Sequence, residues 1–104
     1  MEQRVSNKTE LFQRLTCNGN QIRSFGIEQV SVFGSFARDS NIRPSSDVDL
    51  LLDFTPGHKN FDSLIDLGEF LETVLGRKVE LLTRESLQSE AGKHILATAL
   101  EVSI

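Results

Sequence analysis

Residues 29–54 read QVSVFGSFARDSNIRPSSDVDLLLDF and predict two strands joined by a polar loop. In the first part, valines alternate with polar residues, as in a half-buried strand, until Gly34 and Ser35 make a tight turn. The second part begins at Asp47 and has an unbroken apolar centre, which is typical of a strand covered on both faces. We therefore expect residues 47–54 to form the central strand of a sheet, with one helical turn just after Gly34.

Apolar residues recur at helical spacing on both sides of this stretch. They predict a helix over residues 8–25, weakened by an Asn-Gly-Asn sequence in its middle, and a second helix over residues 61–75. Asn60 can cap the second helix and Gly76 can end it. Its apolar stripe, which we expect to face the core, consists of Phe61, Leu64, Ile65, Gly68, Leu71 and Leu75.

The C-terminal part of the chain completes the pattern. Residues 78–82 predict a third strand, residues 84–99 one or two short helices, and residues 100–104 a final extended segment. Strands that alternate with helices indicate the α/β (α+β) class, with a small mixed β-sheet and helices packed on it. We expect residues 1–104 to form a single domain.

The amino-acid composition argues against nucleic-acid-binding and membrane proteins. The chain has 11 Lys and Arg residues against 15 Asp and Glu residues, a net charge of −4, which would repel a nucleic-acid backbone. The single cysteine, Cys17, cannot form an internal disulfide, and no apolar run approaches the ~20 residues of a membrane span. We therefore expect a cytoplasmic protein that binds neither nucleic acid directly nor a membrane.

Asp47 and Asp49 form the first candidate site. Residues two apart on a strand point to the same face, with Cα atoms roughly 6.6 Å apart at ~3.3 Å per residue. Two carboxylates so placed can share hard cations such as Mg²⁺, which prefers oxygen ligands. An Asp-x-Asp sequence also occurs by chance, so a solvated pair at a strand end is the alternative.

Two further features could add to this site, and each has an ordinary explanation. Gly34 lets the backbone approach a phosphate closely and Ser35 adds a hydroxyl, but Gly-Ser after a strand is also a common turn. Glu80 is a lone acid in an otherwise apolar strand. It joins the two aspartates if its strand lies beside theirs, and otherwise it faces solvent.

The composite pattern resembles a known signature. GSFAR at residues 34–38, Arg43, and SDVDLL at residues 46–51 are similar to the motif of minimal nucleotidyltransferases of the DNA polymerase β superfamily. The resemblance implies the small mixed-sheet nucleotidyltransferase fold. Members of this family are commonly the antitoxins of toxin-antitoxin pairs whose toxin is a HEPN-domain ribonuclease, so it also implies a hetero-oligomer with such a toxin.

The resemblance also implies roles for individual residues. Gly34 and Ser35 would cradle the triphosphate of ATP, and Asp47 and Asp49 would bind Mg²⁺, two ions in all, with Glu80 as the third acid. The family usually has Asp at this third position. Some members transfer AMP from ATP to a Tyr hydroxyl of the toxin and so inactivate it.

Other side chains receive smaller roles. Arg38 and Arg43 are candidate triphosphate contacts, because a guanidinium offers paired donors to phosphate oxygens, although a loop salt bridge would explain them equally well. His58 and His94 have no ligand partner at helical or strand spacing, so we expect neither to bind a metal.

Two alternatives to protein adenylylation stay open. The chain could neutralise its toxin by binding and occlusion alone, with a site that is slow or idle. It could also modify a small molecule, as aminoglycoside nucleotidyltransferases do, although those enzymes usually carry an additional domain that holds the acceptor.

Overall fold

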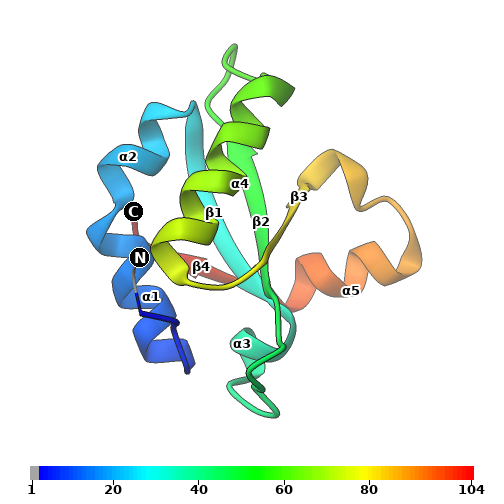
Figure 1. Cartoon of the computed structure of the whole chain (residues 1–104). Helices are drawn as coiled ribbons and strands as arrows, with labels where there is room; N and C mark the ends of the chain where they lie inside the picture. The colour runs from blue at the N-terminus through cyan, green and yellow to red at the C-terminus, as the bar shows by residue number, and fades with distance from the viewer. Residues whose placement is uncertain (1–2) are drawn as a thin grey trace.

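The computed structural model describes residues 3–104 as a four-stranded mixed sheet with helices on both faces (Figure 1). Strands β1 and β2 are the inner pair and run antiparallel, β4 joins β1 antiparallel, and β3 joins β2 parallel. The predicted fold class is therefore confirmed. In sheet order the strands are β3 (Val79–Thr83), β2 (Val48–Phe54), β1 (Ile27–Phe33) and β4 (Leu100–Val102).

The helices begin and end where local signals predict. The expected first helix is divided at Asn18 into two. Asn60 accepts the Asp62 backbone N–H at 2.8 Å, and Gly76, at φ 68°, ends the same helix. None of the helices within residues 3–104 is long and apolar enough to span a bilayer. The helices are α1 (Lys8–Cys17), α2 (Gly19–Ser24), α3 (Gly34–Arg38), α4 (Phe61–Leu75), the 3₁₀ turn η1 (Arg84–Ser86) and α5 (Glu90–Thr98).

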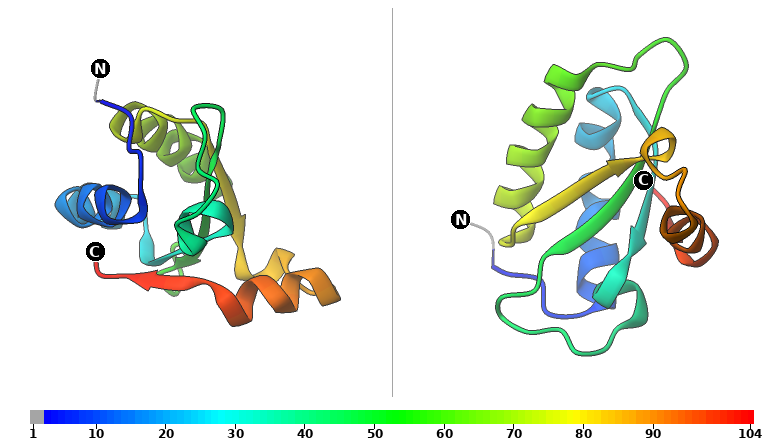
Figure 2. Two further views of the ribbon diagram at one scale, coloured as in Figure 1. Left: turned by 90° about the horizontal axis from the view of Figure 1, so that it is seen from below. Right: turned by 90° about the vertical axis from the view of Figure 1, so that its right-hand side faces the viewer.

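The two faces of the sheet are covered unequally. Helices α1, α2 and α4 pack on one face and form the main core, whereas α5 lies on the opposite face (Figure 2). The second cluster is small and centres on Phe33, Leu51 and Leu87. Since residues two apart on a strand share a face, Asp49 lies on the same side of β2 as Leu51, the side of α5.

One expectation for α4 is wrong. Phe61 and Ile65 are each 64% exposed, although their spacing predicts that they face the core. The buried positions of α4 are Leu67, Leu71, Val74 and Leu75. At 100° per residue, Phe61 lies about 95° and Ile65 about 135° from the centre of this stripe, so the apolar surface of the helix is wider than the surface the sheet covers.

Candidate functional site

Gly34 brings the two halves of the motif into contact. It follows the last residue of β1 and has φ +73°, a conformation that L-residues with a side chain rarely adopt. A Cβ atom at this position would lie 2.3 Å from Oδ2 of Asp49. The backbone angle therefore favours glycine at this position, and any side chain here would also have to displace the carboxylate of Asp49.

The acids come from two neighbouring strands. Asp49 pairs with Phe33 of β1 on one side and with Glu80 of β3 on the other. Glu80 thus lies on the strand adjacent to the Asp49 strand, which is the arrangement that the sequence left open. Asp47 is exposed and comes just before β2 begins.

This crowding changes the acidity of Asp49. Burial, the charge of Glu80 and a hydrogen bond with Glu80 raise the pKa of Asp49 to about 6, with a further contribution from Asp47, while Arg38 acts in the opposite direction. Neighbouring carboxylates disfavour one another's ionised form. A cation bound among them would relieve this repulsion.

The chemistry of these donors fits a hard divalent cation. Carboxylate oxygens are the ligands that Mg²⁺ prefers, and it usually takes a few of them together with substrate phosphates. Asp49 and Glu80 are in contact, and Asp47 lies near enough for its charge to affect Asp49. Within residues 3–104, no three His, Cys, Asp or Glu side chains are already arranged around one metal position.

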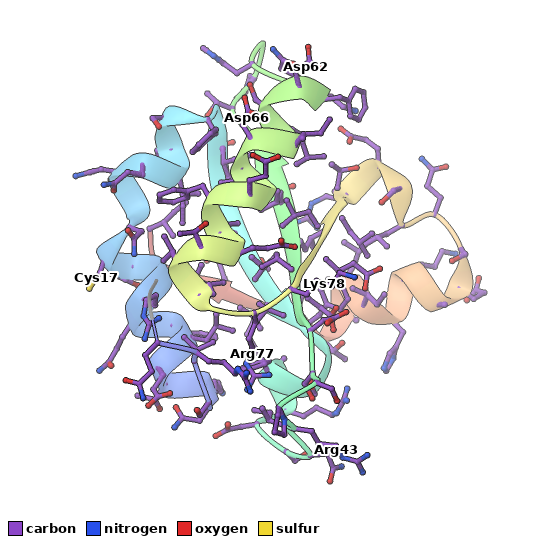
Figure 3. The ribbon with its side chains drawn as sticks, in the orientation of Figure 1. Cys17, Arg43, Asp62, Asp66, Arg77 and Lys78 are labelled. Atoms are coloured by element: carbon purple, nitrogen blue, oxygen red, sulfur yellow. The ribbon has the colours of Figure 1, made fainter. Side chains whose placement is uncertain are left out.

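The two candidate arginines differ in position. Arg38 ends α3, and its charge acts on Asp49. Arg43 lies in the loop before Asp47, where its side chain is exposed and points away from the sheet (Figure 3). The structure therefore brings Arg38 to the acids and leaves Arg43 outside the cluster.

A small pocket adjoins Gly34 on the side of α5. Its volume is about 170 Å³, and its lining includes Arg38 of α3 and His94 and Thr98 of α5. The sequence around His94 argues only against a metal ligand and does not predict this position. The i, i+4 spacing of His94 and Thr98 predicts a shared helix face, but nothing local predicts that this face meets α3.

A larger pocket of about 560 Å³, beside Glu72 and Lys78, contains none of the predicted site residues.

Residues 20–101 match the family model described as a nucleotidyltransferase domain. The chain belongs to this nucleotidyltransferase family. It is 36% identical to the protein adenylyltransferase MntA of Thermococcus cleftensis, over 89% of this chain and 93% of that protein. It is 38% identical to a protein of Methanocaldococcus jannaschii provisionally named a protein adenylyltransferase, over 74% of this chain and 81% of that protein.

Solved structures show the same fold. One, provisionally named a minimal nucleotidyltransferase, superposes with a TM-score of 0.76 at 29% identity and covers 90% of this chain and 94% of its own. A second, a toxin-antitoxin crystal structure with AMP-PNP, superposes with a TM-score of 0.62 at 18% identity, over 91% of this chain and 71% of its own. At that identity the second likeness concerns the fold alone.

Proposed function

We propose that this nucleotidyltransferase is an antitoxin that uses Mg²⁺ to transfer AMP from ATP to a Tyr hydroxyl of a partner HEPN ribonuclease toxin. The observation that carries the proposal is the contact of Gly34 with Asp49, next to Glu80 on the adjacent strand. It puts a backbone that can approach a phosphate beside carboxylates that can share a metal with that phosphate.

The donor nucleotide would bind along the turn after β1. The turn at Gly34, which begins α3, can donate backbone N–H groups to a phosphate, Ser35 offers a hydroxyl, and Arg38 adds a positive charge near the acids. The pocket that Gly34 and Arg38 share with His94 would hold another part of the nucleotide.

The reaction is an in-line displacement at the α-phosphorus of ATP. The acceptor hydroxyl oxygen forms the new P–O bond, the bond to the bridging oxygen of the β-phosphate breaks, and pyrophosphate leaves. Bound Mg²⁺ would lower the pKa of the acceptor hydroxyl and stabilise the charge on pyrophosphate. Asp47, Asp49 and Glu80 would hold the ions, and Glu80 would accept the proton of the hydroxyl.

The names of similar proteins support the proposed partner and the proposed acceptor. The Thermococcus cleftensis relative is named a protein adenylyltransferase, which favours a protein acceptor over a small molecule. The neighbour solved with AMP-PNP is a toxin-antitoxin complex, which favours a toxin as that protein and an adenine nucleotide as donor.

Intact-mass spectrometry of the protein encoded beside this chain, which we propose is the toxin, tests the proposal directly. After incubation with this chain, ATP and Mg²⁺, the toxin should gain mass in AMP units. The Asp47→Asn/Asp49→Asn variant should add none. Asp62→Asn/Asp66→Asn is a matched control, because it removes two acids at the far end of the molecule from α3 and should transfer normally (Figure 3).

One observation supports neutralisation by occlusion as the second candidate. The third acid is Glu80, which is exposed, where the resembling family usually has Asp. If Asp47→Asn/Asp49→Asn abolishes transfer but still blocks the toxin's ribonuclease activity, binding alone neutralises the toxin.

A further inference from the structure

Arg77 is a buried arginine that lies outside the motif. It sits between α4 and β3 and is only 8% exposed. Its Nε donates to the carbonyl of Val5 at 2.6 Å, and its Nη1 donates to the carbonyls of Arg43 and Ser46, both at 2.8 Å. One guanidinium thus joins the N-terminal segment to the loop that leads into Asp47.

The same guanidinium also contacts the other half of the motif. It lies over the ring of Phe36 at 5.1 Å from the ring centroid, and Phe36 is fully buried in α3. Figure 3 shows Arg77 between α1 and α3, above the loop that carries Arg43. Through these contacts Arg77 touches both the helix that begins with Gly34 and the turn that precedes Asp47.

The turn of residues 43–46 has few other anchors. The Ser46 N–H donates to the Arg43 carbonyl and the Arg43 N–H donates to Ser46 Oγ, each at 2.9 Å, so both bonds lie within the turn. Arg43, Pro44 and Ser45 are all exposed. The hydrogen bonds of Arg77 therefore help to fix the position of this turn against the rest of the protein.

We infer, on the basis of the proposed function, that Arg77 is a positioning residue that fixes Asp47 relative to Gly34 through the turn of residues 43–46. It acts through hydrogen-bond direction and not through its charge. The charges that affect Asp49 are those of Glu80, Asp47 and Arg38, and Arg77 is not among them. A lysine at this position would keep the charge but would have one nitrogen in place of the two, Nε and Nη1, from which Arg77 donates.

The kinetic test compares Arg77→Lys with Val74→Ala at a temperature where both variants are fully folded. Val74 is a buried residue at the same end of α4, so Val74→Ala weakens the core without touching the turn. Because misplacing a catalytic group by about 1 Å can cost up to ~100-fold, Arg77→Lys should lower kcat for AMP transfer by about tenfold or more. The KM for ATP should change much less, and Val74→Ala should keep its kcat.

A second measurement does not depend on catalysis. Amide hydrogen exchange followed by NMR should show the Ser46 N–H exchanging about tenfold faster in Arg77→Lys than in Val74→Ala. Ser46→Ala loosens the same turn without changing Arg77, so it should give the same selective loss of kcat. This variant tests the inference even if Arg77→Lys does not fold.

The outcomes separate the two proposals. If the unmodified chain transfers no AMP, the proposed function fails, and the exchange rate at Ser46 still decides the role of Arg77. Equal exchange at Ser46 in Arg77→Lys and Val74→Ala, or an equal loss of kcat in both, overturns the inference and leaves Arg77 as an ordinary part of the core.

Discussion

Asp49 occupies a half-buried strand end between Glu80 and the turn at Gly34, so its protonation is coupled to folding. Its pKa is about 6 in the folded chain against 3.8 for an ordinary aspartate. As the pH falls from 7 towards 4, the folded state takes up a proton that the unfolded state does not bind. Stability therefore increases as the pH falls through this window.

Asp49→Asn removes this dependence. The variant should be more stable than the unmodified chain at pH 7.5, and the difference should shrink as the pH approaches 4. Urea unfolding at a series of pH values measures it. In Glu80→Gln one repelling charge is gone, so the pH-dependent change should be smaller. A stability difference for Asp49→Asn that stays constant from pH 4 to pH 7.5 would contradict the raised pKa of Asp49.

The chemistry of single residues could be predicted from the sequence, but their contacts could not. The prediction that Asp47 and Asp49 share a face uses only the two-residue period of a strand, which is a local property, although Asp47 lies just before β2. The approach of Gly34 to Asp49 depends on the register of β1 against β2, and the position of Glu80 depends on β3 lying beside β2. Both are pairings between distant segments, which local patterns do not encode. For the same reason the sequence did not predict His94 beside Arg38.

Among the elements, α4 shows most clearly what local sequence signals predict and what they do not. Asn60 and Gly76 fix its two ends, and the structure begins and ends the helix there. Its apolar residues do not by themselves show which of them the sheet covers. Phe61 and Ile65 fit the helical period and yet face solvent.

Two alanine substitutions on α4 test this assignment. Leu71→Ala should lower the free energy of unfolding by about 2–5 kcal/mol, because Leu71 is fully buried. Ile65→Ala should change it by less than about 0.5 kcal/mol, as is usual for an exposed position. Thermal or urea unfolding followed by circular dichroism measures both. Similar losses in the two variants would mean that the flank of α4 is covered after all.

On the scale of the whole molecule, acidic charge gathers where β2 and β3 begin. A ligand that binds only the folded state stabilises it by about 2.7 kcal/mol at 100 times its dissociation constant. For a domain of this size, each kcal/mol shifts Tm by about 4–8 °C. If Mg²⁺ binds these acids as proposed, a concentration of 100 times its dissociation constant should raise the Tm of the chain by about 10–20 °C.

Differential scanning fluorimetry with and without Mg²⁺ measures this shift. The Asp47→Asn/Asp49→Asn variant should show none, whereas Asp62→Asn/Asp66→Asn, which removes the same number of charges elsewhere, should respond as the unmodified chain does. An equal shift in both variants would indicate weak binding of Mg²⁺ to acidic surface in general and would contradict a site at Asp47 and Asp49.

The contact between Gly34 and Asp49 also links the two positions in evolution. As long as an aspartate occupies position 49, a Cβ atom at position 34 would displace its carboxylate from the position it holds against the turn. A descendant that gave up the acid would lose this steric constraint and keep only the requirement for a positive φ, which Asn can also meet. In such a lineage, a residue larger than glycine at position 34 would record the loss of the metal ligand.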